Sequence, residues 1–310
     1  MRYMGSRRLT SGLMVACGFV LAATLGGAGP GAAQTRSEHV HQWLFRVSGP
    51  AGESWRVLVT FPRRNDGLEH APGERMPLVV ALHGRGESLK GPLRGMLGWN
   101  VDYLLPEAFG ALARGRLGNP DFRGLVTARH LAAVNASLTR QPFRGIAVVT
   151  PYVPDLSGPV RVAGYADWLA GPLLEQVRHE LPWLATGREA TGVDGVSLGG
   201  MVALEAGFRH PEVFGSVGAM QPAIRDSENR LARLAEDARR EGRRQRIRLL
   251  SSVGDPYLGY ARNLSWLLRR ARVPHTLLVV PGPHDYAFNR GPGAIELLRF
   301  HDEVLARERM

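Results

Sequence analysis

Short apolar runs of strand length alternate with longer amphipathic stretches over most of this chain. The runs at 77–82 and 145–150 are almost continuously apolar, which is typical of strands buried on both faces of a parallel sheet. Further strand-like runs lie at 190–193, 216–220, 247–253 and 276–280, and helical patterns lie at 168–181, 198–209, 228–241, 263–271 and 295–306. Strands that alternate with helices predict right-handed crossovers, and therefore an α/β fold with a doubly wound, mostly parallel sheet.

The N-terminal part of the predicted domain has a different pattern. Two β-rich runs, 42–47 and 55–61, flank a glycine- and proline-containing turn, which indicates a hairpin of antiparallel strands. We therefore assign residues 34–75 to N-terminal strands that belong to the same domain as the core, 76–310.

One long segment, 91–144, interrupts the alternation of strands and helices. It contains the aromatic residues Trp99, Tyr103 and Phe109. Long insertions often carry function, so this predicted helical insertion either packs at the periphery or forms a wall or cap beside a functional site.

Residues 1–33 have the pattern of a secretory signal. The segment starts with the basic residues Arg2, Arg7 and Arg8. An apolar stretch follows at 13–25, and small residues are frequent at 26–33. Cleavage is expected near Ala33, so that the mature protein begins near Gln34. The pattern predicts an exported protein, either periplasmic or secreted.

Two alternatives to a cleaved signal remain open. A membrane anchor is disfavoured because the apolar run is shorter than the roughly 20 residues that a spanning helix needs. A lipoprotein would use Cys17, which is the single cysteine, but the residues before it match a lipid-attachment site poorly. If cleavage occurs near Ala33, the mature chain has no cysteine, and disulfides, a thiol nucleophile and thiolate metal sites are excluded.

The basic charge invites a nucleic-acid interpretation, but its distribution opposes it. The chain has 39 Lys and Arg against 28 Asp and Glu, a formal net charge of +11. Lys90 is the only lysine, and the arginines are spread along the chain, whereas a binding face should cluster its charge. The arginine-rich stretch 225–248 has interleaved acids and an apolar face, which predicts a solvated amphipathic helix. We expect no nucleic-acid partner, no cofactor and no metal, and we interpret His39 and His41 as part of a flexible tail.

The segment Gly195-Val196-Ser197-Leu198-Gly199 matches the pattern G-x-S-x-G. It follows a predicted strand and opens a predicted helix, which is the context that a nucleophilic serine on a sharp turn requires. Ser197 is therefore the candidate nucleophile.

A serine nucleophile needs a base, because its hydroxyl is scarcely ionised near neutrality. His284 follows the last predicted strand and is the candidate base. His275 opens that strand and should lie at the opposite edge of the sheet, His301 falls in the last helix, and His210 is expected at a helix end.

The base in turn needs an acid that fixes its tautomer, with the expected chain order serine, acid, histidine. Asp255 follows the strand run 247–253, at the edge of the sheet where functional groups gather. Asp226, one strand earlier, is the alternative. Asp285 is adjacent to His284 and is poorly placed to reach its ring.

An oxyanion needs two preset donors. The backbone N–H of Leu198 is one candidate. The other should come from the loop after Leu82, where the N–H of Arg85 is the first choice and that of Gly86 the second. His83 is expected only to brace this loop.

These segments resemble those of the α/β-hydrolase superfamily, and within it the putative-esterase group that includes esterase D, feruloyl esterases and polyhydroxyalkanoate depolymerases. The resemblance rests on Leu82-His83-Gly84-Arg85-Gly86, on Gly195 to Gly200 with His210-Pro211-Glu212-Val213-Phe214 after it, on Gly254-Asp255, and on Gly282-Pro283-His284-Asp285-Tyr286. The chain departs from the group at Asp194, a charge where small or apolar residues are commoner, and in the long segment 91–144.

Taken together, the residues and the resemblance predict an exported serine hydrolase that cleaves carboxylic esters through a Ser-His-Asp triad and an acyl-enzyme. A small molecule or a polymer could supply the ester. An acyltransferase or a peptidase or amidase on the same fold is the alternative, as is a non-catalytic binding protein on a hydrolase scaffold.

Overall fold

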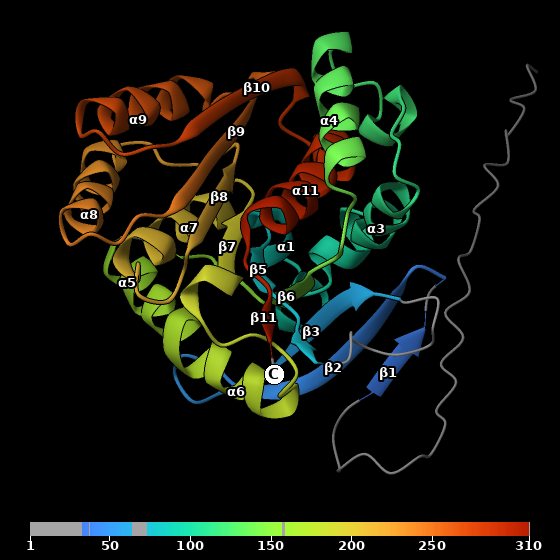
Figure 1. Cartoon of the computed structure of the whole chain (residues 1–310). Helices are drawn as coiled ribbons and strands as arrows, with labels where there is room; N and C mark the ends of the chain where they lie inside the picture. The colour runs from blue at the N-terminus through green and yellow to red at the C-terminus, as the bar shows by residue number, and fades with distance from the viewer. Residues whose placement is uncertain (1–32, 37, 64–72, 157–158, 310) are drawn as a thin grey trace, which may run out of the picture.

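The computed structural model describes residues 33–36, 38–63, 73–156 and 159–309 (Figure 1). Nearly all of the predicted signal, including Cys17, lies outside the described residues, as does most of the polar stretch before residue 74. Among the helices that are described, none has the length and apolar character needed to span a bilayer.

The centre of the molecule is one mixed sheet, in which nine strands are described in the order β1-β2-β3-β6-β5-β7-β8-β9-β10. The strands are β1 (Ala33–Arg36), β2 (Val40–Ser48), β3 (Ser54–Pro62), β5 (Leu78–Leu82), β6 (Ala147–Pro151), β7 (Thr191–Gly195), β8 (Ser216–Met220), β9 (Arg246–Gly254) and β10 (Thr276–Pro283). From β6 to β10 all neighbours are parallel, whereas β1, β2, β3 and β6 pair antiparallel. The predicted α/β class, with a mostly parallel sheet extended by N-terminal antiparallel strands, is confirmed.

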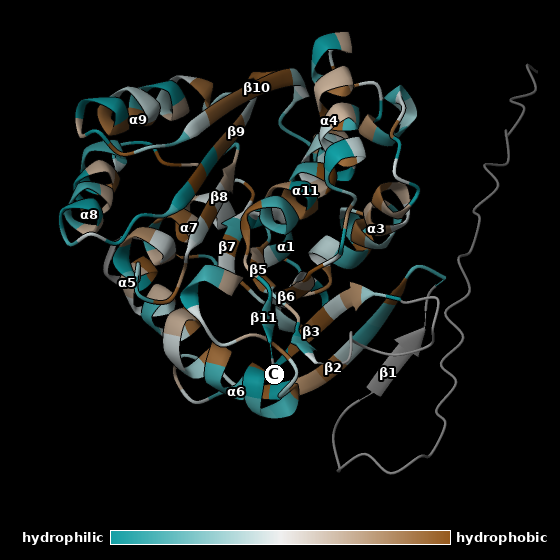
Figure 2. Cartoon of the chain, in the orientation of Figure 1, coloured by the Kyte–Doolittle hydropathy of each residue, from teal (hydrophilic) through white to brown (hydrophobic). Residues whose placement is uncertain are grey.

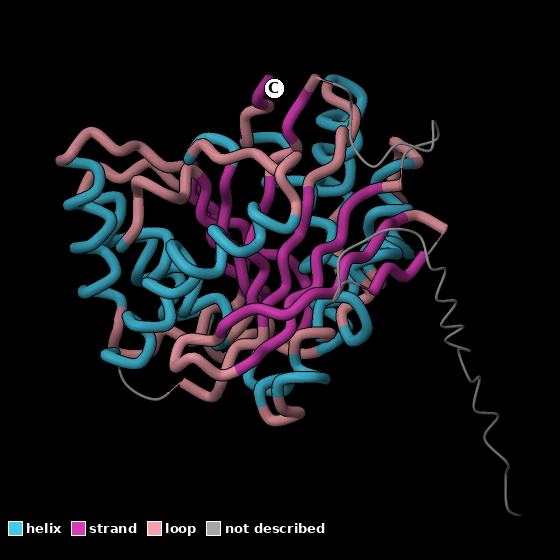
Figure 3. The backbone as a smooth tube through the Cα atoms, turned by 90° about the horizontal axis from the view of Figure 1, so that it is seen from below, coloured by secondary structure: helices cyan, strands magenta, loops and turns pink. Residues whose placement is uncertain are grey.

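Helices cover both faces of this twisted sheet (Figure 3). The α-helices are α1 (Arg85–Ser88), α2 (Pro92–Gly95), α3 (Leu105–Ala113), α4 (Ala128–Arg140), α5 (Pro159–Trp168), α6 (Leu174–Glu180), α7 (Leu198–Arg209), α8 (Glu228–Arg240), α9 (Leu258–Arg270), α10 (Tyr286–Phe288) and α11 (Ala294–Val304). Short helices of other types are η1 (Gly98–Asp102), η2 (Asn119–Phe122), η3 (Leu169–Leu173), η4 (Arg188–Ala190) and η5 (Asn289–Gly293). A small antiparallel pair, β4 (Glu74–Arg75) with β11 (Glu308–Arg309), ties the C-terminal segment to the residues before β5.

The strand β5 shows why the sheet is buried on both sides. Leu78, Val80 and Leu82 belong to one core cluster, which includes residues of α5, α7, α8 and α9. Val79 and Ala81 belong to a second cluster, which includes residues of α3, α4 and α11. Successive side chains of a strand point to opposite faces, so an uninterrupted apolar run fills both clusters.

Part of the arginine-rich stretch 225–248 forms the predicted amphipathic helix, α8 (Glu228–Arg240). The prediction is wrong for the end of the stretch, because residues 246–248 begin β9 and Arg248 is buried. In α8, Leu231, Ala235 and Ala238 are buried, while Arg233 and Arg240 are exposed. Hydrophilic residues make up much of α8 and α9, and hydrophobic ones concentrate along strands such as β10 (Figure 2).

The segment 91–144 contains α2, η1, α3, η2 and α4, and no strand is found in this fully described part of the chain. Trp99, Tyr103 and Phe109 are almost completely buried in the second core cluster, against residues of β5, β6 and α11. These three aromatic side chains therefore anchor the segment to the sheet.

The interpretation of His39 and His41 as a flexible tail is wrong for His41. His41 lies in β2 and is buried, and its ring stacks on that of Phe61 with the ring centroids 5.4 Å apart. The cause is the length of the β2–β3 ladder, which begins at the pair Val40 and Pro62. Within the described ranges, no cluster of His, Cys, Asp and Glu side chains could hold a metal ion.

Candidate active site

Ser197 occupies the turn between β7 and α7, in a strained backbone conformation. Its φ is +57° and its ψ is −115°, values that a residue with a side chain rarely adopts. The N–H of Ser197 donates to the carbonyl oxygen of Met220 at 2.9 Å, and its own carbonyl accepts from Ala223 N–H at 3.0 Å. These bonds to the end of β8 and to the segment after it hold the strained turn in place.

The flanking glycines are required by close backbone contacts. A Cβ on Gly195 would collide with the carbonyl oxygen of Gly199, and a Cβ on Gly199 would collide with that of Leu82. The absence of a side chain at Gly195 therefore lets the turn close on the start of α7, and its absence at Gly199 lets the turn pack against the end of β5.

The structure brings together the three side chains that the sequence selects as nucleophile, base and acid. His284 Nε2 lies 3.0 Å from Ser197 Oγ, and His284 Nδ1 lies 2.9 Å from Asp255 Oδ1. For a neutral His284, these two contacts require the tautomer in which Nδ1–H donates to the Asp255 carboxylate and Nε2 accepts from the Ser197 hydroxyl. The His284 side chain is 24% exposed, so the imidazole is accessible from solvent.

Asp255 is held rigidly and its side chain is inaccessible. Its Oδ2 accepts from Ser251 Oγ at 2.5 Å, and its Oδ1 also accepts from Tyr257 N–H at 2.9 Å. The Tyr257 ring packs edge-on against the His284 imidazole, with centroids 5.4 Å apart. These contacts orient both the carboxylate and the imidazole.

The rival acids differ from Asp255 in their surroundings. Asp226 is exposed, with a φ of +62°. Asp285 caps α10, because its Oδ1 accepts from the N–H groups of Ala287 and Phe288 at 2.8 and 3.3 Å.

The rival histidines also have other partners. His275 lies before β10 and pairs with Ser265 Oγ at 2.8 Å. His210 pairs with Asp167 at 2.8 Å and Glu212 at 3.1 Å, and His301 is buried in α11.

The loop after β5 reaches Ser197 through Gly84. A Cβ on Gly84 would lie 3.7 Å from Ser197 Cβ, which is ordinary contact distance. The carbonyl oxygen of Gly84 accepts from His83 Nδ1–H at 2.9 Å and from Glu87 N–H at 3.2 Å. Because a trans peptide directs its C=O and N–H to opposite sides, these bonds point the N–H of Arg85 away from the helix α1.

His83 braces this loop as a neutral side chain. Its Nε2 accepts from Val153 N–H at 2.9 Å, while its Nδ1–H donates to Gly84. Burial lowers the pKa of His83 to about 4, against the smaller raising effect of its bond to Gly84. The tautomer and the loop geometry are therefore preserved at neutral pH.

Candidate oxyanion donors come from two helix N-termini. Leu198 begins α7, and Arg85 and Gly86 begin α1. First-turn amides have no partner within their own helix, so they are available to an anion. The Arg85 side chain points elsewhere, since its guanidinium makes two hydrogen bonds to Asp155, at 3.0 and 3.2 Å.

Sequence reasoning gave no role to Glu87 or Tyr286, which meet beside the 84–86 loop. Tyr286 OH donates to Glu87 Oε1 at 2.8 Å, although the two residues are 199 positions apart. The only signal in the sequence was that both lie within or next to the segments that carry the resemblance.

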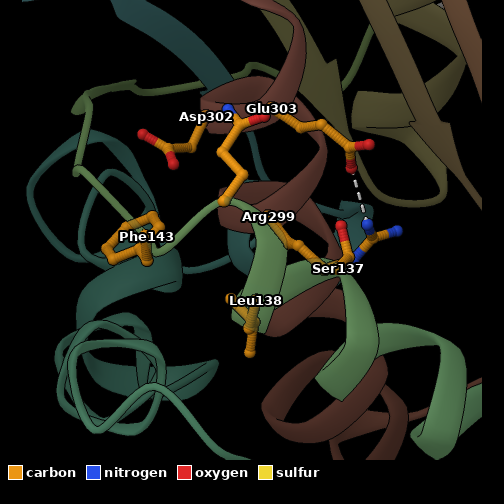
Figure 4. A pocket seen from close by; sticks show the side chains of 7 residues that line it. Ser137, Leu138, Phe143, Arg299, Asp302 and Glu303 are labelled. Carbon is orange, nitrogen blue, oxygen red and sulfur yellow. Dashed lines mark hydrogen bonds and ion pairs between the residues drawn. The ribbon is translucent and has the colours of Figure 1, made fainter.

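A small pocket between α4 and α11 is separate from these residues. It is lined by Ser137, Leu138, Gln141, Phe143, Arg299, Asp302 and Glu303 (Figure 4). An ion pair between Arg299 and Glu303, 2.8 Å long, joins two of these residues along α11. None of the predicted site residues contributes to its lining.

The sheet topology, the strained serine between β7 and α7 and the histidine after β10 define the fold as that of an α/β-hydrolase. The family described as "Putative esterase" matches residues 156–277. This match confirms the predicted resemblance to the putative-esterase group and supports assignment of the chain as a carboxylic ester hydrolase.

Solved structures show the same fold. A ferulic acid esterase has a TM-score of 0.63 and 15% identity, with 86% of this chain and 99% of that chain covered. S-formylglutathione hydrolase from Staphylococcus aureus has a TM-score of 0.57 and 13% identity, with coverages of 86% and 98%. A ferulic acid esterase from Anaeromyces mucronatus has a TM-score of 0.52 and 17% identity, with coverages of 87% and 93%. A comparison with curated protein sequences gives no match.

Proposed function

We propose that this protein is a serine hydrolase that cleaves carboxylic esters through an acyl-enzyme, with Ser197, His284 and Asp255 as its catalytic triad. The observation that supports this most strongly is the hydrogen-bonded sequence from Ser197 Oγ to His284 Nε2 and from His284 Nδ1 to Asp255. The accessible imidazole and the strained serine turn support the same proposal.

In the first half-reaction, Ser197 Oγ attacks the ester carbonyl carbon while its proton passes to His284 Nε2. Asp255 stabilises the imidazolium that forms. The N–H groups of Leu198 and Arg85 bind the oxyanion. The N–H of Gly86 is the alternative to that of Arg85. The tetrahedral intermediate then collapses, the alkoxide leaves with the proton from Nε2, and the acyl group stays on Ser197.

In the second half-reaction, water gives a proton to His284 Nε2 and attacks the acyl carbon. Collapse of that intermediate releases the carboxylic acid and returns the proton to Ser197 Oγ. An alcohol in place of water would give acyl transfer with the same residues.

We further propose that the protein is exported, into the periplasm or out of the cell. The support is the signal-like pattern of residues 1–33. N-terminal sequencing of the exported protein should give a start near Gln34 without lipid. An intact Met1 or a lipidated Cys17 would contradict this.

The hydrolase proposal is tested with p-nitrophenyl esters of increasing acyl length. The parent protein should release p-nitrophenol, and Ser197→Ala should reduce kcat by about 10⁶. Ser227→Ala, a change at a half-buried serine before α8, is the matched control and should behave as the parent. Equal activity in the Ser197→Ala variant would contradict the proposal.

A further inference from the structure

A buried carboxylate lies directly behind the loop that carries the candidate oxyanion donors. Glu87 is 2% exposed. Its Oε2 accepts from Tyr103 OH in a short hydrogen bond, and its Oε1 accepts from Tyr286 OH at 2.8 Å. Lys90 Nζ lies 3.5 Å from Oε1. A buried carboxylate is costly unless it is paired and hydrogen-bonded, and here both oxygens are satisfied.

Tyr103 links this carboxylate to the backbone beside Ser197. Its hydroxyl accepts from Gly84 N–H at 3.1 Å while it donates to Glu87. Burial, and then the neighbouring Glu87, raise the pKa of Tyr103 well above its usual value, so the hydroxyl remains a donor at neutral pH. The position of Gly84, and with it the Arg85 N–H, therefore depends on Glu87.

Tyr286 links the same carboxylate to the segment that carries His284. It lies two positions after that histidine, at the start of α10, and is 39% exposed. Burial and the bond to Glu87 raise the pKa of Tyr286, which keeps its hydroxyl protonated. Arg290 stacks over the Tyr286 ring at 5.4 Å and donates from Nε to the Asp102 carbonyl at 2.8 Å.

The Glu87 side chain is closely packed against the 91–144 segment. A Cβ on Gly98 would lie 2.6 Å from Glu87 Cγ. Lys90 is fixed in turn by an ion pair with Asp102, 2.8 Å long. The hydrogen-bonded group of Glu87, Tyr103 and Tyr286, here called the bridge, therefore packs against the 91–144 segment as well as against the two loops.

We propose that Glu87 is a positioning residue that couples the two halves of the site, holding the 84–86 amides through Tyr103 and the His284 segment through Tyr286. Loss of the bridge should let the oxyanion donors and the imidazole shift relative to Ser197. A small misplacement of reacting groups lowers the rate of the chemical step more than it weakens substrate binding. The inference rests on the proposed serine hydrolase function.

The test uses the full mature protein and two readouts, kcat and KM on a p-nitrophenyl ester and the rate of labelling by a fluorophosphonate probe. Tyr286→Phe removes only the hydroxyl of a partly exposed side chain. It should lower kcat and the labelling rate on the order of tenfold, with KM and the melting temperature close to those of the parent. Tyr260→Phe, at a half-buried tyrosine on α9, is the matched control and should leave all four quantities unchanged.

A double-mutant cycle tests the shared bridge. If Tyr286 acts through Glu87, the variant Glu87→Gln with Tyr286→Phe should be no slower than Glu87→Gln alone. The inference would be overturned if the two substitutions lowered kcat additively. It would also be overturned if the parent hydrolysed the ester and Tyr286→Phe had the same kcat as the parent. If Glu87→Gln does not fold, the kcat of Tyr286→Phe relative to the parent tests the inference instead. A parent that neither hydrolyses esters nor reacts with the probe would instead contradict the proposed function, and this inference with it.

Discussion

Arg248 Nη2 on β9 lies 2.7 Å from Asp194 Oδ2 on β7, and both side chains are almost completely inaccessible. Asp194 stands directly before the Gly195 of the serine turn, and its Oδ1 accepts from Gly195 N–H at 2.8 Å. His301 Nε2 lies 3.0 Å from the same Oδ2, and His301 Nδ1 lies 2.8 Å from Ser216 Oγ. This buried network accounts for the charge at position 194, where the resemblance predicts a small or apolar residue.

The network predicts a large stability loss when one charge is removed. Arg248→Met leaves Asp194 buried without its cationic partner, because its remaining hydrogen bonds come from the Gly195 N–H and from His301, whose pKa burial lowers. We expect the free energy of unfolding to fall by about 3–5 kcal/mol, measured by urea denaturation. Combining Asp194→Asn with Arg248→Met should recover part of that loss.

A surface arginine provides the control for this prediction. Arg243 is exposed and lies 3.7 Å from Glu241, so Arg243→Met should change the free energy of unfolding by less than about 1 kcal/mol. Equal effects of the two arginine changes would show that the Asp194–Arg248 pair has no special role.

Glu296, buried in α11, predicts a specific response to acid. Burial alone would raise the pKa of its carboxyl, but Arg299, at 2.8 Å, and His130, at 2.9 Å, lower it from 4.5 to about 2. Because the folded pKa is depressed, the stabilisation is complete above about pH 4.5 and is lost as pH falls from 4.5 to 2. That shift corresponds to on the order of 3 kcal/mol.

We therefore expect Glu296→Gln to be less stable than the parent at pH 6, with a difference that narrows as pH falls toward 2. Urea denaturation at several pH values measures it. A difference that does not change with pH would contradict this account of Glu296.

The assignment of the acid predicts unequal effects of two similar changes. Asp255→Asn should lower kcat by about 10⁴, because an amide favours the wrong imidazole tautomer. Asp226→Asn, at an exposed residue, should have a mild effect. Steady-state kinetics on one ester, with circular dichroism to verify folding, measures both. A severe loss in the Asp226 variant alone would place the acid after β8 instead.

The assignment of the base predicts a similar contrast between two histidines. His284→Ala should abolish ester hydrolysis, because it removes the Nε2 atom that lies 3.0 Å from Ser197 Oγ and is placed to accept its proton. His275→Ala should retain activity, since the His275 ring, which precedes β10, bonds to Ser265 on α9. The reverse pattern of kcat values would exclude His284 as the base.

Elements with strong local signals could be predicted from the sequence. The strand 216–220 and the helix 198–209 have the predicted bounds, because one is a bounded apolar run and the other opens at the G-x-S-x-G turn. The helix α9 begins at Leu258, earlier than the predicted 263, because Gly259 weakens the helical pattern in its first turn. The predicted helix 168–181 is the second part of a longer helical region, which begins at Pro159 and which the structure divides into α5, η3 and α6.

Contacts between distant residues could not be predicted in this way. Periodicity places a side chain on a face of its own element, but it does not show which element lies opposite. Glu87 with Tyr286, and Asp194 with Arg248 and His301, are joined only by the folded topology. The three candidate catalytic residues were accessible to prediction because a motif and a chain order, rather than a distance, identify them.

The most direct test of the central claim is covalent labelling of the parent protein with a fluorophosphonate probe, followed by mass spectrometry of the labelled peptide. A fluorophosphonate reacts with an activated serine hydroxyl, so the account predicts one modified residue, Ser197, and no labelling of Ser197→Ala. A modification at another serine, or a Ser197→Ala variant that labels as fast as the parent, would contradict the identification of the nucleophile.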